Sequence, residues 1–347
     1  MFLRNIARSI GKQLTVKALS IYDQFHHLEK YESFVLVYHR VVGTRHKTNI
    51  STPNDIYNIS QKDFEKHITF LKKSYEIVSL DSLVDDLKNF KPISGKIALT
   101  FDDGFRDNYE YAYPIIKEYN FPATIYLMGY PSAPVTLWWL AIEALILEAD
   151  SKNISFRFND IYINYPIQLA RDKIKTIKIL SSYFMSIPFN SHNDFLKMIF
   201  SSLGHDSLPD HQSLLLSKEM IKDMYNSGLV SFGGHSKSHS VLSLLDKKML
   251  DSEIAEHRSR LKEILDVPIS SFSYPYGMPN YISEEAVDTV KKCGYKYAVS
   301  GLIGQLSSVN DDYFMLPRVT ATGSSSVNDL NIRTSYLYKN IKMRFGM

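Results

Sequence analysis

Cysteine is almost absent from this chain, since Cys293 is the only one in 347 residues. A disulfide within the chain is therefore excluded, and so is a zinc site made of several thiolates. A bound metal ion must instead be held by histidine and carboxylate side chains. The chain has 11 histidines, so their positions decide whether such a site can form.

Long apolar runs and a strong net charge are also missing. No run of about 18 apolar residues occurs, so no membrane-spanning helix is predicted. The formal net charge of +3 is small for a chain of this length and predicts no nucleic-acid partner. An apolar content of 44% with 13% aromatic residues is enough for a large packed core, either as two domains or as one barrel with insertions.

The N-terminus lacks the continuous apolar core and the small-residue cleavage site of a secretory signal. Apolar residues instead recur every four positions, basic residues occupy another face, and no acidic residue precedes Asp23. This pattern predicts an amphipathic helix over residues 1–30. Residues 1–20 could make a peripheral contact with an anionic membrane, dock on the protein or a partner, or serve as an organelle transit peptide. We expect a cytoplasmic protein, or one at the cytoplasmic face of the membrane.

Strand-like and helix-like segments alternate along most of the chain. Strands are predicted at 34–42, 75–79, 97–101, 122–128, 229–235, 270–274, 295–299 and 313–317, with helices at 60–73, 81–89, 107–119, 246–265 and 283–292 and one capped by Ser217. This alternation is typical of parallel β/α architecture and predicts one domain over 31–325, with a C-terminal tail at 326–347. The rhythm breaks between about 130 and 215, which predicts a largely helical insertion with one strand-like run at 154–165.

Two adjacent carboxylates follow the predicted strand at 97–101. In the stretch Ile-Ala-Leu-Thr-Phe-Asp-Asp-Gly-Phe at 97–105, Gly104 permits a sharp turn that leaves Asp102 and Asp103 at the C-terminal end of the strand. Neighbouring carboxylates repel each other in a confined site unless a cation or a proton intervenes, which favours metal binding or acid–base chemistry. The alternative is a solvated turn between two elements.

A pair of histidines, His235 and His239, follows another predicted strand. On a helical turn, side chains at this spacing share one face and can converge on one ion, whereas two unrelated surface histidines are the alternative. With Asp103 they provide two nitrogens and one oxygen and leave positions open for water and substrate, as in hydrolytic zinc sites. The same set of ligands suits non-haem iron, so the ligands alone predict a divalent ion without identifying it. Zinc is the metal that we expect.

Three motifs together resemble those of one known family. Thr-Phe-Asp-Asp-Gly at 100–104, His-Ser-Lys-Ser-His at 235–239 and Phe-Ser-Tyr-Pro-Tyr-Gly at 272–277 are similar, in this order, to the first three motifs of the polysaccharide deacetylases. These are the family 4 carbohydrate esterases with a NodB homology domain. The similarity covers roughly 34–128 and 215–320. It implies an α/β fold, a distorted (β/α) barrel with its site at the C-terminal ends of the strands.

The resemblance also implies roles for the matched residues. The metal ligands would be Asp103, His235 and His239. The ion polarises the carbonyl of an N-acetyl group and lowers the pKa of water, while Asp102 acts as the general base. The backbone N–H of Tyr276 would stabilise the oxyanion, and Pro275 and Tyr276 would belong to the substrate-binding set. Tyr274 and Tyr276 could also line a sugar-binding face, although aromatic residues after a strand usually belong to the core.

The chain departs from the family pattern in two places. The family commonly has an arginine where this chain has Ser273, and a late Leu-x-His motif, whereas no histidine follows His257 here. Arg318, also placed in the substrate-binding set, could replace that arginine and orient Asp102, or it could form a surface salt bridge. His39 could protonate the leaving amine, as in the exopolysaccharide-modifying members with an early Tyr-His motif, or be a core histidine. The first and last strands of a closed barrel are neighbours, so both exchanges are geometrically reasonable.

Several other residues have simpler interpretations. Trp138 and Trp139 could form a platform for a sugar ring or anchor the inserted helices to the barrel. Asp107 and Asn108 are expected to start the following helix. His257 lies among charged residues of a predicted helix and is expected to be solvated.

These patterns predict a metal-dependent hydrolase that removes N-acetyl groups from an amino-sugar glycan or glycan precursor. Its partner would be an N-acetylated carbohydrate. One alternative is the same metal site acting on an O-acetyl ester, a formamide or another small amide. A second alternative is a glycan-binding pseudoenzyme, which has kept the metal ligands and lost the general acid.

Overall fold

A computed structural model of the chain describes residues 33–43, 52–131, 133–306, 312–323, 325–327 and 329–330. The amphipathic helix predicted at 1–30 and most of the predicted tail at 326–347 lie outside these residues. Within the described ranges, every helix is too short or too polar to cross a lipid bilayer.

The main body is built on a sheet of eight parallel strands in the order β11-β10-β9-β6-β5-β1-β12, with β4 paired to β5 beside this path. The strands are β1 (Phe34–Tyr38), β4 (Glu76–Ile77), β5 (Lys96–Phe101), β6 (Ala123–Leu127), β9 (Val230–Gly234), β10 (Ile269–Ser273), β11 (Tyr297–Val299) and β12 (Val319–Thr320). Most are short apolar runs buried on both faces, as parallel strands covered by helices require. The predicted parallel β/α architecture is confirmed.

The sheet curls until its two edges approach each other. β12 pairs with β1, and Val299 at the end of β11 forms a single bridge with Leu316, just before β12. The distorted barrel is therefore confirmed, with the first and last strands as neighbours. The strand predicted at 313–317 is wrong, because residues 312–315 form a turn instead. In this turn the Asp312 carbonyl accepts the Met315 N–H and its side chain accepts the Phe314 N–H.

Helices cover the outside of the sheet. They are α2 (Gln61–Ser74), α3 (Leu80–Lys88), α4 (Tyr113–Tyr119), α8 (Lys218–Asn226), α9 (Lys247–Leu250), α10 (His257–Leu265) and α11 (Glu284–Lys292). The predicted Ser60 and Ser217 caps are confirmed, since each hydroxyl accepts a backbone N–H of the first helical turn. The helix predicted over 107–119 begins as the π-helical turn η2 (Asn108–Ala112), and a second π-helical stretch, η6 (Asp251–Glu256), joins α9 to α10.

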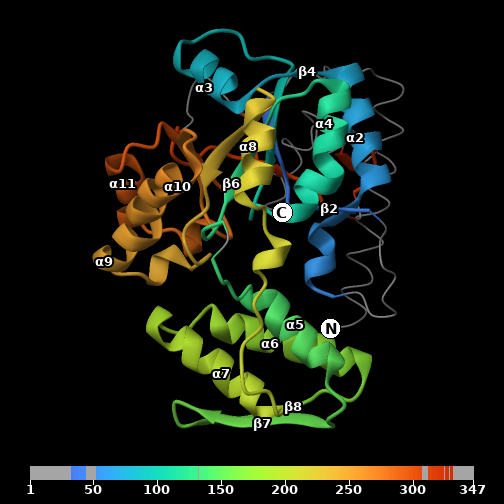
Figure 1. Cartoon of the computed structure of the whole chain (residues 1–347), viewed down its shortest axis with the longest axis vertical. Coiled ribbons are helices and arrows are strands. Elements are labelled where there is room, and N and C mark those ends of the chain that lie inside the picture. Colours follow the sequence, from blue (N-terminus) through green and yellow to red (C-terminus); the bar gives the residue numbers. More distant parts are fainter. Residues whose placement is uncertain are drawn as a thin grey trace, which may run out of the picture.

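The predicted insertion forms a layer of its own beneath the barrel in Figure 1. It contains α5 (Trp138–Glu148), the antiparallel hairpin β7 (Asn153–Phe158) and β8 (Ile161–Pro166), α6 (Ala170–Phe184) and α7 (His192–Ser202). Its apolar side chains make a core distinct from that of the barrel, in which Trp138 stacks on Phe184 with ring centroids 4.3 Å apart. Trp138 thus anchors α5 within the insertion itself.

The remaining elements are short. β2 (Arg40–Val42) and β3 (Asn58–Ser60) form a small parallel pair beside the barrel. Single helical turns are η1 (Asn54–Tyr57), η3 (Phe189–Ser191), η4 (Gln212–Leu214), η5 (Leu242–Leu244) and η7 (Pro279–Tyr281).

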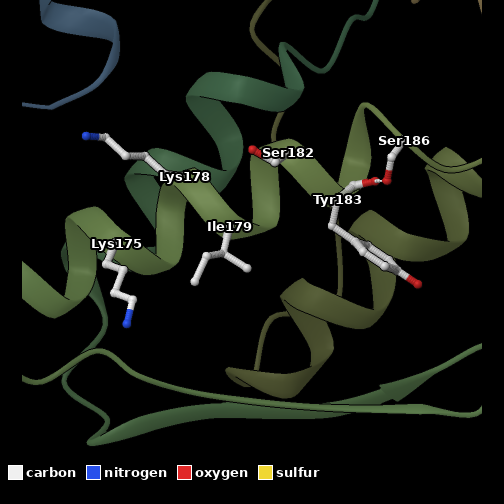
Figure 2. Close-up of a pocket in the computed structure, with 6 residues that line it drawn as sticks. All are labelled: Lys175, Lys178, Ile179, Ser182, Tyr183 and Ser186. Carbon is white, nitrogen blue, oxygen red and sulfur yellow. Dashed lines mark hydrogen bonds between the residues drawn. The ribbon is translucent and has the colours of Figure 1, made fainter. Parts of the chain in front are cut away.

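One open pocket lies on the surface of the insertion, along α6. Its lining residues are Lys175, Lys178, Ile179, Ser182, Tyr183 and Ser186 (Figure 2). None of them belongs to the predicted site.

Candidate metal centre

Asp102 and Asp103 lie directly after β5, at the C-terminal edge of the sheet. The Asp102 N–H donates to the Tyr38 carbonyl of β1 at 3.0 Å, which continues the strand pairing by one residue. The chain then turns sharply, because Asp103 and Gly104 both adopt left-handed backbone conformations, with φ values of 72° and 70°. A Cβ on residue 104 would lie 2.9 Å from the Leu127 side chain, so only glycine fits here. The turn leaves the two carboxylates pointing to different partners.

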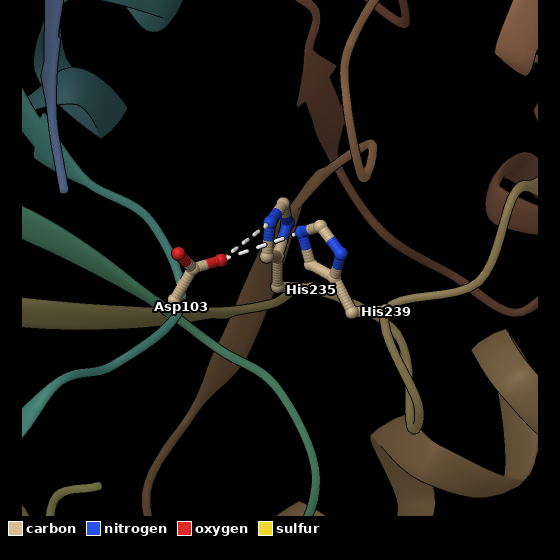
Figure 3. A group of neighbouring side chains, drawn as sticks. All are labelled: Asp103, His235 and His239. Atoms are coloured by element: carbon tan, nitrogen blue, oxygen red, sulfur yellow. Dashed lines mark ion pairs between the residues drawn. The ribbon is translucent and has the colours of Figure 1, made fainter. Parts of the chain in front are cut away.

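Asp103 meets the two predicted histidines. Its Oδ1 atom lies 3.3 Å from His235 Nε2 and 3.4 Å from His239 Nε2, and all three side chains are buried (Figure 3). His235 comes directly after β9 and reaches Asp103 across the carboxyl ends of the strands. His239 does not share a helical turn with it as we predicted. Residues 235–239 form a loop, in which Ser236 and His239 have positive φ angles of 62° and 54°.

The histidine ring of His235 is oriented by a hydrogen bond. Its Nδ1 lies 2.7 Å from the Ser273 carbonyl, to which only a protonated Nδ1 can donate. In the neutral form of this ring the lone pair is on Nε2, the nitrogen that faces Asp103. Such a carbonyl partner is common behind metal-ligating histidines. His239 has no equivalent bond to any described residue, since its buried Nδ1 is without a partner among them.

These three residues fit a divalent ion. Ligand atoms bound at about 2.0–2.2 Å to one tetrahedral ion lie about 3.4 Å from one another, close to the separations seen here. Asp103 Oδ1 is buried and has no hydrogen-bond partner within the described residues, an arrangement that a cation would satisfy. Burial opposes the ionised form of Asp103, but its pKa still lies below the usual range because the histidines face it. The centre therefore offers one carboxylate oxygen and two imidazole nitrogens.

Asp102 forms a bidentate ion pair with Arg318. The Arg318 Nη1 and Nη2 atoms donate to Oδ1 and Oδ2 of Asp102 at 2.8 Å and 2.7 Å, and both side chains are buried. Ser273 completes the group, because it accepts from Arg318 at 3.0 Å and donates to Asp102 at 3.2 Å. Burial would raise the pKa of Asp102, but the guanidinium outweighs it and holds that pKa well below its usual range.

The position of Arg318 differs from the prediction, because it precedes β12 instead of ending a strand. Its side chain runs through the inside of the barrel and also donates to the Ser300 carbonyl and to Thr100. Every guanidinium nitrogen is thus engaged within the protein. Of the two roles predicted for Arg318, this geometry supports the orientation of Asp102 over direct substrate contact, and it excludes a surface salt bridge.

His39 follows β1 and lies beside the two carboxylates. Burial lowers its pKa, while the charges of Asp103 and Asp102 oppose this effect. Its ring packs against Tyr57 with centroids 4.6 Å apart, and its buried Nδ1 has no hydrogen-bond partner among the described residues. The role predicted for His39 as the proton donor stays a prediction.

Asp107 and Asn108 start the helical segment as expected, with Asn108 as the first residue of η2, and their side chains hold the backbone around His39 without making a capping hydrogen bond. Asn108 Nδ2 donates to the His39 carbonyl at 2.8 Å. Asp107 accepts from Arg40 Nε at 2.6 Å. Both side chains thus contact the segment 39–40 that follows β1.

The Tyr-Pro-Tyr-Gly segment follows β10 and borders the histidines. Pro275 is buried, and Tyr276 has a positive φ of 61° and donates its hydroxyl proton to the His239 carbonyl at 3.0 Å. Tyr274 is only 1% exposed, so the prediction that it could line a sugar-binding face is wrong. It packs instead against Phe272 in the barrel core.

Residues from the insertion complete the surroundings. The Trp139 ring lies 4.8 Å from the His239 ring and is partly exposed, so this tryptophan borders the metal centre instead of only anchoring α5. The expectation that His257 is solvated is wrong: it is fully buried, and its Nε2 lies 2.8 Å from the Gly129 carbonyl. Sequence reasoning also missed Glu253, which is buried four residues before His257. The only sequence signal for it was that Glu253 and His257 are both titratable and stand four residues apart, the spacing of one face of a helix.

Comparisons with known proteins agree with this geometry. The polysaccharide deacetylase family model matches residues 91–138 and 150–298, more than half of the chain. The chain is 22% identical over 268 residues to YxkH of Bacillus subtilis (strain 168), whose name places it in the same family; the match covers 77% of this chain and 63% of YxkH. The chain therefore spans less than two thirds of that relative.

Two further relatives are similar over more of their length. The poly-beta-1,6-N-acetyl-D-glucosamine N-deacetylase of Staphylococcus aureus (strain MRSA252) is 22% identical over 302 residues, which is 83% of this chain and 78% of that protein. Among solved structures, the Streptococcus pyogenes deacetylase PplD in complex with acetate superposes with a TM-score of 0.57 at 17% identity, covering 88% of this chain and 98% of that one. The latter similarity shows a shared fold.

Proposed function

Because the chain belongs to the polysaccharide deacetylase family, we propose that it is a metal-dependent hydrolase that removes N-acetyl groups from an amino-sugar glycan. The observation that carries the proposal is the buried Asp103–His235–His239 cluster beside a carboxylate held by Arg318. The similarity to a named poly-N-acetylglucosamine deacetylase supports a polymer or precursor of N-acetylglucosamine as the substrate.

The proposed roles follow from the contacts of each residue. Asp103, His235 and His239 would hold the ion, with zinc the expected metal, and a bound ion supplies polarisation of the amide carbonyl and a lower pKa for water. Asp102 accepts the proton that this water loses as its oxygen bonds to the carbonyl carbon. Arg318 and Ser273 fix the direction of the Asp102 oxygens.

Two more residues act on the other atoms of the amide. The backbone N–H of Tyr276 donates to the oxyanion of the tetrahedral carbon. His39 then donates its proton to the leaving nitrogen as the C–N bond breaks, which releases acetate and the free amine. Tyr57 packs against the His39 ring and Trp139 against the His239 ring, so both aromatic side chains border this centre. They are placed to contact the sugar ring.

The metal requirement tests the proposal directly. Removal of the ion with a chelator should lower the rate of acetate release from an N-acetylglucosamine oligomer by more than about 100-fold, since the ion supplies several kcal/mol of transition-state stabilisation. Addition of zinc should restore the rate in the wild type and not in His235→Ala. His205→Ala, at an exposed histidine of the insertion, is the control. Full activity of metal-free protein would overturn the proposal.

The role of His39 has its own prediction. His39→Gln should lower kcat by about 100- to 10,000-fold, because the leaving amine must be protonated, while the zinc content stays at the wild-type level. Rates and metal content are measured for this variant, for His205→Gln and for the wild type. A glycan that binds the wild type without turnover, and binds His39→Gln equally well, would favour the glycan-binding pseudoenzyme.

We also propose two properties that rest on the N-terminal stretch alone. These are a peripheral membrane contact through residues 1–20 and a place at the cytoplasmic face of the membrane. The basic amphipathic pattern of this stretch is what supports them.

A further inference from the structure

A buried carboxylate outside the metal cluster contacts the loop that carries one of its ligands. Glu253 lies in η6 and is 3% exposed, although the surrounding helix is rich in charged residues. A π-helical turn inserts one residue into the helix and changes which side chains face inward, and such turns are frequent at functional sites. Here Glu253 and His257 both face the interior, toward residues 235–239.

Glu253 makes three hydrogen bonds to this loop. Its Oε2 accepts the Ser238 N–H at 2.9 Å, its Oε1 accepts the Ser238 hydroxyl proton at 2.8 Å, and its backbone carbonyl accepts the Lys237 N–H at 3.1 Å. Ser238 and Lys237 are two of the three residues between the metal-ligating histidines. The carboxylate is not itself a ligand, since the cluster consists of Asp103, His235 and His239.

The loop depends on such contacts because its conformation is unfavourable by itself. Ser236 and His239 are both in the left-handed region, which side chains other than glycine rarely adopt unless the surroundings determine it. Within the loop, His239 makes one hydrogen bond to a side chain: its N–H donates to Ser236 Oγ at 3.0 Å. Nδ1 of the His239 ring has no hydrogen bond within the part of the chain that the structure describes, so the direction of the ring follows the loop backbone and its packing against Trp139 and Tyr276.

His257 supports the same loop from the other side. Its Nε2 lies 2.8 Å from the Gly129 carbonyl, and the Gly129 N–H donates to the Ser236 carbonyl at 3.2 Å. Glu253 therefore contacts the middle of the loop directly, and His257 contacts its first part through Gly129. His235, by contrast, is held by Ser273 and the end of β9.

We propose that Glu253 is a positioning residue that sets the metal affinity of the Asp103–His235–His239 centre by holding residues 236–239 in the ligating conformation. The inference rests on the proposed function, because it requires that this centre binds a divalent ion. Partners that orient metal ligands commonly change metal affinity by about 10- to 100-fold when they are removed. Glu253 should act on the affinity for the ion and leave the chemistry of the loaded centre nearly unchanged.

The test measures zinc affinity directly, without substrate. Whole-chain protein is stripped of metal, and its dissociation constant for zinc is determined by competition with a chromogenic chelator. Glu253→Ala should weaken binding by about 10- to 100-fold. Glu253→Gln should weaken it less, because the amide can still accept the Ser238 N–H and donate to its hydroxyl. Glu256→Ala, at an exposed position of the same helix, is the matched control and should bind zinc like the wild type.

A second readout separates positioning from a general loss of structure. At saturating zinc, the kcat of Glu253→Gln should return to within a few-fold of the wild type, and thermal unfolding reports whether either variant folds. Equal zinc affinity of wild type and both Glu253 variants would overturn the inference while leaving the proposed function intact. A wild type that binds zinc no better than Asp103→Ala would overturn both. A kcat that excess zinc does not restore in folded Glu253→Gln would also overturn it.

Discussion

Asp102→Asn should lower kcat for glycan deacetylation by about 100- to 10,000-fold without removing the metal ion. Asn has the same shape as Asp and keeps one oxygen for Arg318, but an amide does not accept a proton from the attacking water. Asp102 is 3% exposed and lies next to the ligand Asp103 but is not one of the three clustered ligands, so it is placed for proton transfer without holding the ion. The rate of acetate release and the zinc content are the quantities to measure.

Asp103→Asn is the matched control for this prediction. The two carboxylates are adjacent and both buried, but they face different partners, Arg318 for Asp102 and the histidines for Asp103. Asp103→Asn should therefore lose both metal and activity, whereas Asp102→Asn should lose activity alone. If Asp102→Asn retained most of the wild-type kcat, or if it lost zinc as Asp103→Asn does, Asp102 would not be the base.

Arg318→Met should lower the free energy of unfolding by about 3–5 kcal/mol near neutral pH, the usual effect of removing one partner of a buried ion pair. Met fills much of the space of the arginine stem but leaves Asp102 buried beside Ser273 without a cation. The substitution also removes the bonds to Thr100 and the Ser300 carbonyl. Urea unfolding of chelator-treated protein measures the loss. Arg260→Met, which breaks the exposed Arg260–Glu263 pair, should change stability by less than about 1 kcal/mol.

The loss should depend on pH in a defined direction. In the wild type the pKa of Asp102 is depressed, because Arg318 outweighs the effect of burial. The stabilisation that this gives is present above the unfolded pKa of about 4 and decreases as the pH falls toward the folded value. In Arg318→Met burial is no longer opposed by the guanidinium, so the pKa rises and the folded state is disfavoured as the pH increases. The stability difference between wild type and variant should therefore grow from pH 4 to pH 7.

The same variant also tests whether Arg318 replaces the arginine that the family commonly has at position 273. Orientation of the base requires the bidentate pair with Arg318. Arg318→Met should therefore lower kcat strongly and change KM much less. A stability difference that stays constant between pH 4 and pH 7 would show that the pair does not control the ionisation of Asp102. Loss of substrate affinity with unchanged kcat would instead support direct contact between Arg318 and the substrate.

The metal ligands could be predicted because local patterns place them. A glycine after two aspartates ends β5 with a carboxylate at the sheet edge, and the paired histidines follow β9 in the same way. Parallel strands bring their carboxyl ends to one edge, so residues 132 positions apart in sequence, Asp103 and His235, were expected to meet. Alternation of strands and helices indicated the parallel sheet, and the break in that alternation indicated the insertion.

The tertiary structure decided how the ligands and the base are held. Arg318 reaches Asp102 from 216 positions away because the barrel curls until β12 lies beside β1. No local pattern specifies such a contact, which is why a surface salt bridge remained an open alternative. The loop conformation of His239, and the contact with Trp139 from a separate layer, also depend on long-range packing. Helical spacing had instead predicted a helical turn at 235–239.

The wrong expectation for His257 has a local structural reason. His257 and Glu253 lie in a helix rich in charges, which predicts solvent exposure, but the π-helical turn rotates both toward the loop of the metal centre. Asp107 and Asn108 start their helix as expected, at a second π-helical turn, but their contacts with the His39 carbonyl and with Arg40 were not expected. Hydrophobic periodicity determines which face of a regular helix is buried. It does not show where a π-helical turn shifts the inward-facing side chains by one residue, because the position of that turn depends on packing in the folded barrel.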